Sequence, residues 1–441
     1  MSTEFVSTIG LEVHVQLNTK SKIFSAASTE YGAEPNTQAC AVDLGLPGVL
    51  PVLNAEAVKM AIMFGLAINA KIENNSIFAR KNYFYPDLPK GYQISQYEIP
   101  IVSGGSIEIE TEEIKKIINI TRAHLEEDAG KSIHDLFVNE TAIDLNRAGT
   151  PLIEIVSEPE MANAKEAVSY LKTIHSLVRY LDISDGNMQE GSFRCDANVS
   201  LKEKGSIQLG TRTEIKNLNS FKFVEQAINF EIKRQGKLLL NNQNVVQETR
   251  LYDPQKNETR PMRSKEEAND YRYFPDPDLL PVEITEETLT KIRENMPELP
   301  HERKTRFADQ YNLSEYDIGI LTSDKSLSIF FEAILKERDI DPKFTANWVI
   351  TELLALANKH SINPQDITIT AKDFADLLFS IKNNEISSKQ GKSVLEKMWE
   401  SGDNPSSIIK SAGLSQISDE DELNKLVDNV LKNHYKSVEE Y

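Results

Sequence analysis

Cysteine is scarce in this sequence, since its 441 residues include two, Cys40 and Cys195. Two thiols exclude a disulfide framework, and they also exclude a zinc site built from four thiolates. Any bound metal must therefore be held by oxygen and imidazole ligands. Such ligands favour Mg²⁺ or Mn²⁺ over a softer metal.

Long apolar runs and excess positive charge are also missing. No stretch of 18 apolar residues occurs, so we expect no membrane-spanning segment. The first residues carry no basic segment typical of a signal or transit peptide, which predicts a cytoplasmic protein. The formal net charge is −19, which argues against indiscriminate nucleic-acid binding. If RNA binds, it binds through shape and selected contacts.

The clearest pattern lies near the start of the chain. Apolar residues alternate with polar ones from Ile9 to Leu17, which is the period of a strand with one face in a core. Glu12 and His14 then project to the same polar side, roughly 6.5–7 Å apart along the strand. At that spacing a carboxylate and an imidazole can share a metal, bind two metals side by side, or face water.

Further strands carry acids or amides. A strand near residue 120 ends in three consecutive carboxylates, which repel one another unless a cation or water separates them. Two later segments also alternate: the first places Asp144 and Asn146 on one face, and the second turns Cys195 toward the core, where a thiol is usually inert. Another strand contains Glu214 and Lys216. These patterns predict an open sheet whose polar face carries Glu12, His14, Glu126, Glu127, Glu190, Asp196 and Asn198.

Two segments mix aromatic residues with cations. Residues 80–96 have the composition of a ligand-binding loop, although an aromatic loop packed over the sheet has the same composition. Residues 248–281 would suit phosphates and a stacked base, and surface ion pairs are the alternative. The candidates for contacting a nucleotide or substrate are Lys81, Tyr83, Tyr85, Arg147, Asn198, Lys216 and Arg272.

The order of elements predicts an α+β fold, with a largely antiparallel sheet followed by an all-helical region. In the first part we expect helices at 54–69 and 160–182, a helix after Ser220, and a hairpin turn at Ser103–Ser106. From residue 296 onward short helices take over, in two subdomains that meet near Asn363. The expected helices include Lys325–Glu337, Phe344–Lys359, Ala371–Asn383, Ser388–Glu400 and Pro405–Ala412.

Seven long segments carry a family resemblance: Ile9–Leu17, Lys81–Gln96, Arg122–Lys131, Asp144–Pro159, Glu190–Ser200, Lys216–Phe221 and Asp270–Pro281. They resemble the motifs of the GatB family, which is the B component of the tRNA-dependent amidotransferase GatCAB. The resemblance implies amidation of misacylated Glu-tRNA(Gln), and often Asp-tRNA(Asn), by ATP-dependent phosphorylation of the side-chain carboxylate and attack of ammonia. It also implies three domains: a cradle-shaped catalytic domain (1–295), a helical domain (296–372) and a YqeY-like tail domain (373–441) that contacts tRNA.

The resemblance also implies roles for particular residues. Positions that the family uses for catalysis and Mg²⁺ match Glu12, His14 and Glu127, and further Mg²⁺ positions match Glu126, Glu190 and Asp196. Mg²⁺ and ATP are the implied cofactors. The implied partners are GatA, an amidase-type glutaminase, the small protein GatC, and misacylated tRNA(Gln) or tRNA(Asn).

Two departures from the family pattern are visible. Many members bind zinc through four cysteines around the segment equivalent to residues 28–45, whereas this chain has Cys40 there, so we expect no zinc site. The family usually continues beyond the position of Tyr441, so we expect an incomplete tail. Candidate tRNA contacts in the helical region are Lys389, Lys392, Lys397, Lys410, Lys425, Lys432 and Lys436.

Two other functions compete with this interpretation. A non-catalytic tRNA-binding scaffold is disfavoured by the acidic net charge and by the carboxylate-lined sheet. A stand-alone amidase or glutaminase needs an activated nucleophile, and the chain offers no plausible Cys-His pair. Its short Ser387-Ser388-Lys389 stretch lies at a predicted helix start.

Overall fold

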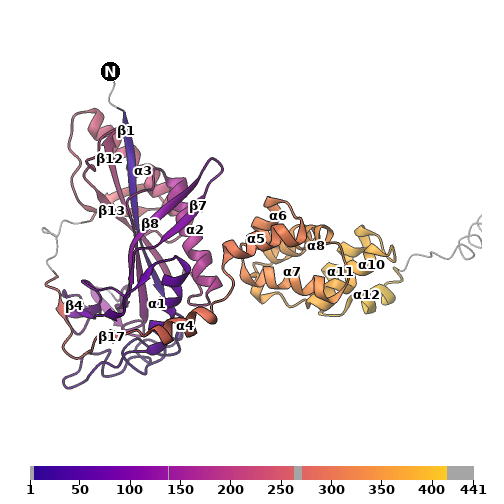
Figure 1. Ribbon diagram of the computed structural model, residues 1–441, viewed down its shortest axis with the longest axis horizontal. Coiled ribbons are helices and arrows are strands. Elements are labelled where there is room, and N and C mark those ends of the chain that lie inside the picture. Colours follow the sequence, from indigo (N-terminus) through magenta and orange to yellow (C-terminus); the bar gives the residue numbers. More distant parts are fainter. Residues whose placement is uncertain (1–3, 138, 263–270, 415–441) are drawn as a thin grey trace, which may run out of the picture. The chain divides into compact units, whose positions relative to one another are not determined.

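The computed structural model describes residues 4–137, 139–262 and 271–414. The chain divides into two compact units, Met1–Leu299 and Pro300–Tyr441 (Figure 1). Each unit has its own hydrophobic core. The α+β prediction is confirmed, because a largely antiparallel sheet dominates the first unit and the described part of the second unit is helical.

One large sheet organises the first unit, and β1 (Phe5–Gln16) lies in its interior. Its strands pair antiparallel, except that β13 and β14 are parallel. The strand order is β15 (Glu258–Pro261), β14 (Thr249–Asp253), β13 (Thr213–Lys216), β12 (Phe193–Glu203), β1, β11 (Pro151–Ser157), β8 (Lys115–Glu127), β6 (Val102–Ser103) and β2 (Lys71–Ile72), and β7 (Ser106–Glu110) also pairs with β8.

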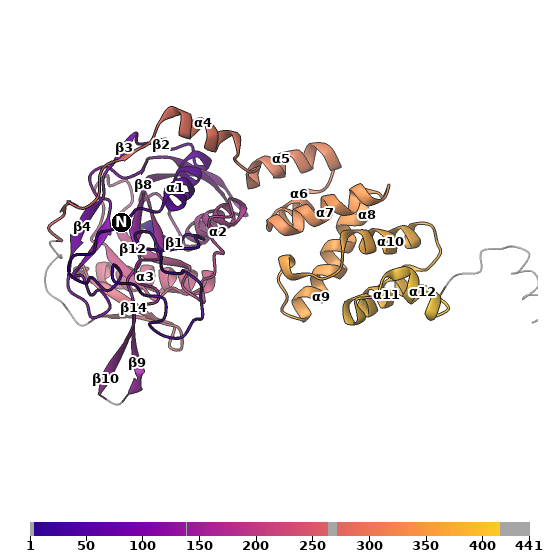
Figure 2. The same ribbon diagram turned by 90° about the horizontal axis from the view of Figure 1, so that it is seen from below.

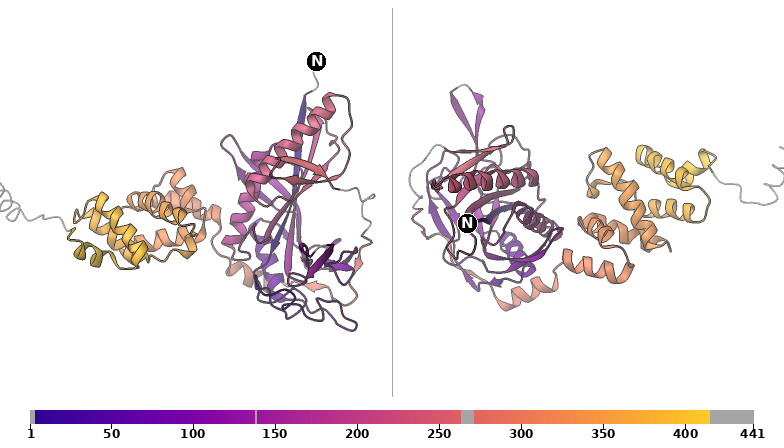
Figure 3. Two further views of the ribbon diagram at one scale, coloured as in Figure 1. Left: turned by 180° about the vertical axis from the view of Figure 1, so that it is seen from behind. Right: turned by 90° about the horizontal axis from the view of Figure 1, so that it is seen from above.

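Three helices cover the apolar face of this sheet (Figure 3). They are α1 (Ala55–Ala67), α2 (Ala164–Tyr180) and α3 (Phe221–Leu240). Each follows a residue whose side chain accepts a backbone N–H of the first turn: Asn54, Asn163 and Ser220. All three predicted helices are thus confirmed, the second beginning a few residues later than expected because its cap is Asn163.

The predicted hairpin turn at Ser103–Ser106 is wrong. Both β6 and β7 pair with β8, Val102 opposite Ala123 and Ser106 opposite Asn119, so the chain continues along one partner instead of reversing. Gly104 takes a φ of +72°, a conformation that glycine adopts without steric cost. The two glycines therefore mark a kink between two segments that pair with the same strand, and not a reversal.

Smaller sheets accompany the large one. Strand β5 (Tyr92–Ser95) packs against β8, and Ser95 Oγ donates to Glu126 Oε2 on the polar face at 3.2 Å. The hairpin of β9 (Lys131–Phe137) and β10 (Glu140–Asp144) projects from its unit (Figure 2). The remaining elements of this unit are β3 (Asn75–Ser76) paired with β17 (Val282–Glu283), the sheet of β16 (Phe274–Pro275), β4 (Ala79–Asn82) and β5 (Tyr92–Ser95), and α4 (Glu286–Glu294).

The helices of the second unit share one hydrophobic core. Four of the five helices expected there are confirmed to within one residue; the expected helix Phe344–Lys359 begins at Pro342, after the cap Asp341, and contains a π-helical turn at Val349–Leu353. The predicted boundary at residues 372 and 373 falls in the first turn of α10. The elements are α5 (Pro300–Tyr311), α6 (Glu315–Leu321), α7 (Lys325–Glu337), α8 (Pro342–Trp348), α9 (Leu354–Lys359), a 3₁₀ turn (Pro364–Asp366), α10 (Ala371–Lys382), α11 (Ser388–Ser401) and α12 (Pro405–Ser411).

Among the helices that the structure describes, none combines the length and the apolar character that crossing a bilayer requires.

A buried ion pair closes the segment between β1 and α1. Lys22 Nζ lies 3.4 Å from Asp43 Oδ2, and both side chains are almost completely buried. Asp43 also accepts hydrogen bonds from Ser25 Oγ at 2.9 Å and from the Cys40 backbone N–H at 2.8 Å. Gly149 leaves room for this arrangement, since a Cβ there would lie 2.7 Å from Asp43 Oδ1. Charge and hydrogen bonds thus hold the segment in which the sequence predicts no zinc site.

Lys22→Met is expected to lower the free energy of unfolding by about 3–5 kcal/mol, because it leaves the Asp43 carboxylate buried without its cation. Cys40→Ser is the control, with an expected change below about 0.5 kcal/mol. Urea unfolding of both variants measures the difference. Equal losses in the two variants, or zinc in the purified protein, would contradict this account of the segment.

Candidate functional site

The polar face of the large sheet brings acidic side chains from separate strands together. Glu12 and His14 share this face of β1, as the alternation predicts. The ladders place Asp196 of β12 opposite Glu12, and Glu154 of β11 opposite His14. Two clusters form, one around each of these β1 residues.

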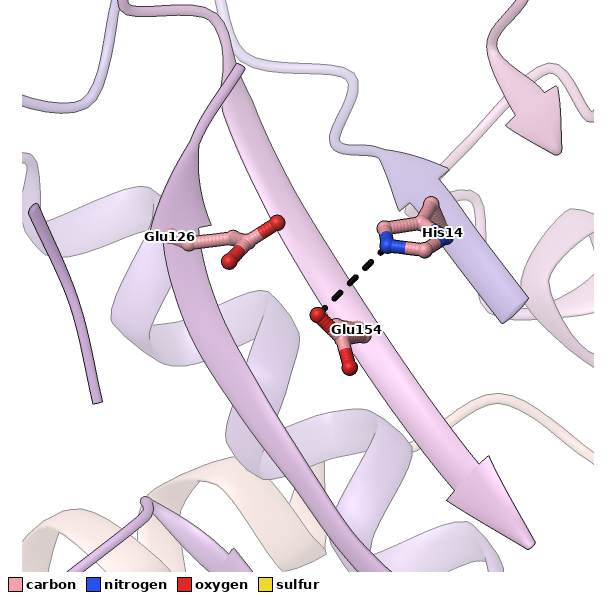
Figure 4. Close-up of side chains that lie close together, drawn as sticks. All are labelled: His14, Glu126 and Glu154. Carbon is pink, nitrogen blue, oxygen red and sulfur yellow. Dashed lines mark ion pairs between the residues drawn. The ribbon is translucent and has the colours of Figure 1, made fainter. Parts of the chain in front are cut away.

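The first, which we call the histidine cluster, consists of His14, Glu126 and Glu154 (Figure 4). Their possible ligand atoms all lie within 4.8 Å of one another. His14 Nε2 lies 3.4 Å from Glu154 Oε2. A second imidazole, buried His124, approaches from β8, with Nε2 3.5 Å from Glu154 Oε2 and 3.6 Å from Glu126 Oε2. Among the described residues, its Nδ1 has no hydrogen-bond partner.

Charge pairing dominates the histidine cluster. Burial alone would lower the pKa of His14, but its hydrogen bond to Glu154 and the charges of Glu154 and Glu126 raise this pKa to about 9. Burial works against the charge of Glu154, yet the charge of His124 and the hydrogen bond from His14 lower its pKa below the usual range. The carboxylates are therefore ionised in a buried place and require positive charge nearby.

The second, which we call the carboxylate cluster, consists of Glu12, Asp196 and Glu214, again with possible ligand atoms within 4.8 Å of one another. Lys216 Nζ lies 2.7 Å from Asp196 Oδ2 and 3.0 Å from Glu214 Oε1. Asn198 Nδ2 donates to Glu12 Oε1 at 2.9 Å. Burial and the charges of the neighbouring carboxylates raise the pKa of Glu12. The excess negative charge makes this a favourable place for a cation.

The donor sets of both clusters fit divalent cations. Three carboxylates suit Mg²⁺ or Mn²⁺, which prefer hard oxygen ligands. Adding an imidazole, as His14 does, shifts the preference of the histidine cluster toward Mn²⁺ or another first-row metal. No thiol belongs to either cluster.

Two predicted metal ligands lie outside both clusters. Alternation turns Glu127 away from Glu126, and its carboxylate contacts Lys90 Nζ and accepts the Ile94 backbone N–H at 2.8 Å. Glu190 was expected on a strand but lies exposed in a turn, because β12 begins only at Phe193. The structure thus does not bring Glu127 or Glu190 to the clusters.

Among the predicted nucleotide or substrate contacts, Asn198 and Lys216 contact the carboxylate cluster, and Lys81 lies beside the histidine cluster. Burial alone would lower the pKa of Lys81, but the charges of Glu126 and other nearby groups raise it. Its Nζ lies 5.0 Å from the centre of the Tyr271 ring.

The other predicted contacts have different surroundings. Tyr83 donates to Gln93 Oε1 at 3.3 Å, and the ring of exposed Tyr85 lies 6.4 Å from the Tyr83 ring. Arg147 donates to the backbone carbonyls of Ala129 and Gly130 at 2.9 and 2.7 Å. The Arg272 carbonyl accepts from Asn82 Nδ2 at 2.8 Å. The two hydrogen bonds of Arg147 thus stabilise the turn after β8.

Sequence reasoning missed Glu154, Glu214 and His124 as members of the site. Asp144 and Asn146 drew attention instead, but Asp144 ends β10 and its Oδ1 accepts from the Asn146 backbone N–H at 3.0 Å. A usable signal existed for Glu154, a single acid inside the apolar run of β11 that is buried in the structure. Such a residue is rarely buried without a partner or a metal.

Comparison with known proteins gives consistent matches. Residues 7–290 match the family described as "GatB/GatE catalytic domain", and residues 329–441 match the "GatB domain". A relative from Vesicomyosocius okutanii is 60% identical over 435 residues, which cover 99% of this chain and 91% of the relative. Relatives from Thioalkalivibrio sulfidiphilus and Coxiella burnetii are each 58% identical to this chain. Each alignment covers 99% of this chain and 92% of the relative. All three are named as the B component of an aspartyl/glutamyl-tRNA(Asn/Gln) amidotransferase.

Proposed function

Because this chain belongs to the GatB family, the B components of aspartyl/glutamyl-tRNA(Asn/Gln) amidotransferases, we propose that its two clusters carry out the ATP-dependent half of the amidation. The substrate is tRNA(Gln) misacylated with glutamate, tRNA(Asn) misacylated with aspartate, or both. One observation carries the proposal: the histidine and carboxylate clusters stand next to each other on one face of the sheet, joined through Glu12 and His14 of the same strand.

The reaction has two steps. In the first, an oxygen of the side-chain carboxylate attacks the γ-phosphorus of ATP, the bond from that phosphorus to the bridging oxygen breaks, and ADP leaves. In the second, ammonia attacks the carbonyl carbon of the acyl phosphate, the carbon–oxygen bond to phosphate breaks, and the nitrogen loses a proton. The products are the amide and inorganic phosphate.

The chain's own residues position the groups that react. A divalent cation held by Glu12, Asp196 and Glu214, or by His14, Glu126 and Glu154, would neutralise phosphate charge. Lys216 and Lys81 place fixed positive charge beside the two clusters. Asn198 fixes the orientation of the Glu12 carboxylate through its hydrogen bond. Catalysis of phosphoryl transfer consists largely of such positioning and charge stabilisation.

The competing functions fit the structure less well. A scaffold that only binds tRNA has no use for two groups of buried or half-buried carboxylates, whose desolvation costs free energy. For a stand-alone amidase, Cys195 lies in the core, where burial raises its pKa well above the usual value. Ser387 serves as the N-cap of α11 in a capping box with Gln390.

The ammonia is supplied, in this proposal, by the amidase-type glutaminase GatA, with the small protein GatC completing the heterotrimer in the cytoplasm. The purified chain alone is therefore expected to release no ammonia from glutamine. With these partners it should convert ATP to ADP in the presence of misacylated tRNA, and uncharged tRNA serves as the matched control. Ammonia released by the isolated chain, or equal ATP consumption with uncharged tRNA, would refute the assignment.

A further inference from the structure

Strand β8 changes phase beside the histidine cluster. Ile120 is buried before this point and Ala123 after it, because the ladder with β11 has a register shift there. A bulge of this kind redirects a side chain. Here it turns Arg122 to the same face as His124 and Glu126.

The ladders also fix where Arg122 lies relative to the carboxylate cluster. Arg122 is opposite Val156 of β11, and Val156 is opposite Glu12 of β1. Two strand spacings therefore separate the Cα atoms of Arg122 and Glu12, about 10 Å. The long Arg122 side chain therefore starts at the edge of the polar sheet face that carries both clusters.

Arg122 has hydrogen-bonding capacity that the described residues do not use. Its Nε is buried and, within the described ranges, has no hydrogen-bond partner. Two other cations on this face are paired: Lys216 with Asp196, and Arg194 with Asp128 at 2.8 and 3.0 Å. A buried N–H without an acceptor costs free energy, and a bound anion would remove that cost.

We propose that Arg122 binds the γ-phosphate of ATP and stabilises the charge on it during transfer to the misacylated side chain. The inference rests on the proposed function. A guanidinium presents its N–H donors in a planar fork that matches two phosphate oxygens, and it stays charged at every physiological pH. As the bond from the γ-phosphorus to the bridging oxygen breaks and the bond to the substrate carboxylate oxygen forms, charge spreads over the equatorial oxygens that such a fork contacts.

The position favours ATP as the source of this phosphate over the tRNA backbone. Two of the carboxylates that would hold the divalent cation accompanying ATP lie in the same cross-strand row as Arg122. Glu12 is two strands away from Arg122, and Asp196 lies opposite Glu12 on the next strand. A cation held there would neutralise charge on the phosphate being transferred.

The test compares Arg122→Gln and Arg122→Lys in the complete heterotrimer. Arg293→Gln is the matched control, an exposed arginine of α4 in the same unit. Three quantities are measured: the single-turnover rate of ADP formation with misacylated tRNA, the affinities for ADP and for a non-hydrolysable ATP analogue, and the affinity for tRNA. Melting temperature and Mn²⁺ binding establish that each variant is folded.

Arg122→Gln is expected to slow ADP formation by about 10³-fold or more, and Arg122→Lys by less, because it keeps the charge but loses the fork. Affinity for the ATP analogue should fall while affinity for ADP and tRNA stays within about twofold of the wild type, since ADP has no γ-phosphate. A wild-type rate in a folded Arg122→Gln complex overturns the inference, as does an equal loss of ATP-analogue and ADP affinity.

Weaker tRNA binding with unchanged binding of the ATP analogue would also overturn it, because the phosphate would then belong to the tRNA. If Arg122→Gln fails to fold, Arg122→Lys decides: a folded lysine variant with the wild-type rate and nucleotide affinities refutes the role. A wild-type complex that consumes no ATP with misacylated tRNA would instead refute the proposed function, so the two failures are distinguishable.

Discussion

Alanine at Glu12 or at His14 is expected to abolish ATP-dependent amidation, with a loss of at least about 10³-fold in rate, or about 4 kcal/mol of transition-state stabilisation. Each residue belongs to one of the two clusters that would hold the cation, and the clusters meet along β1. The measurement is formation of the amidated aminoacyl-tRNA from ammonia, with the glutaminase activity of the partner protein followed in parallel. That partner activity should stay normal, because neither residue supplies its nucleophile.

Two further variants sharpen this prediction. Glu154→Gln and Glu214→Gln should fail as severely as the alanine variants, because each removes one carboxylate from a cluster. Glu190→Ala is the control: the resemblance assigns Glu190 to the metal, whereas the structure places it exposed in a turn, so its replacement should be tolerated. Excess chelator should stop the reaction reversibly without unfolding the unit. Normal amidation by the Glu12 and His14 variants at low Mg²⁺ would contradict the site.

The second large effect concerns the helical unit. Removing residues 300–441 is expected to raise the apparent KM for misacylated tRNA by about tenfold or more, with a much smaller effect on ammonia-dependent turnover at saturating tRNA. In the proposed function the reacting end of the tRNA would bind at the sheet, so a separate surface is needed to hold its body, and duplex RNA is recognised mainly by shape. Steady-state kinetics against tRNA concentration separates the two parameters. An unchanged KM would assign this unit to assembly of the heterotrimer instead.

The cut belongs between Leu299 and Pro300, where the two units divide. A cut at residue 373 would remove most of α10, whose Phe374, Leu377 and Leu378 are buried in the core shared with α7 and α8. Such a truncation would unfold the remaining helices, and any loss of tRNA affinity would then be uninformative.

Individual lysines give a milder version of this test. Lys389, Lys397 and Lys410 lie on α11 and α12, and Lys392 Nζ is 2.6 Å from Glu352 Oε1. The other candidate contacts, Lys425, Lys432 and Lys436, lie outside the described residues. Lysines at such positions would bind tRNA phosphates. Replacing them should therefore reduce both the affinity for tRNA and the salt dependence of that affinity.

A feature of this structure could be predicted from the sequence when it depends on residues that are close together in the chain. The shared face of Glu12 and His14 follows from alternation within one strand. Helix α2 follows from its apolar stripe, and the starts of α1 and α3 follow from Asn54 and Ser220. These are short-range properties, and the structure confirms them. The hairpin expected at Ser103–Ser106 failed because β6 and β7 share the distant partner β8.

The composition of the clusters was harder to predict because it depends on which strands become neighbours. Glu154 reaches His14 because β11 lies between β1 and β8, an arrangement that no local pattern reveals. Glu127 is a different case: it follows Glu126 directly in sequence, so the local alternation of β8 already places it on the opposite face, where it contacts Lys90. The bulge that redirects Arg122 is likewise a property of the ladder with β11.

The most direct test of the central claim follows an oxygen atom. The side-chain carboxylate of the glutamate on misacylated tRNA is labelled with ¹⁸O, and the inorganic phosphate released during amidation is analysed by mass spectrometry. If the carboxylate is phosphorylated by ATP before ammonia attacks, one labelled oxygen must be carried into each phosphate. Phosphate without the label, accompanied by normal formation of the amide, would show that no acyl phosphate forms and would contradict the account.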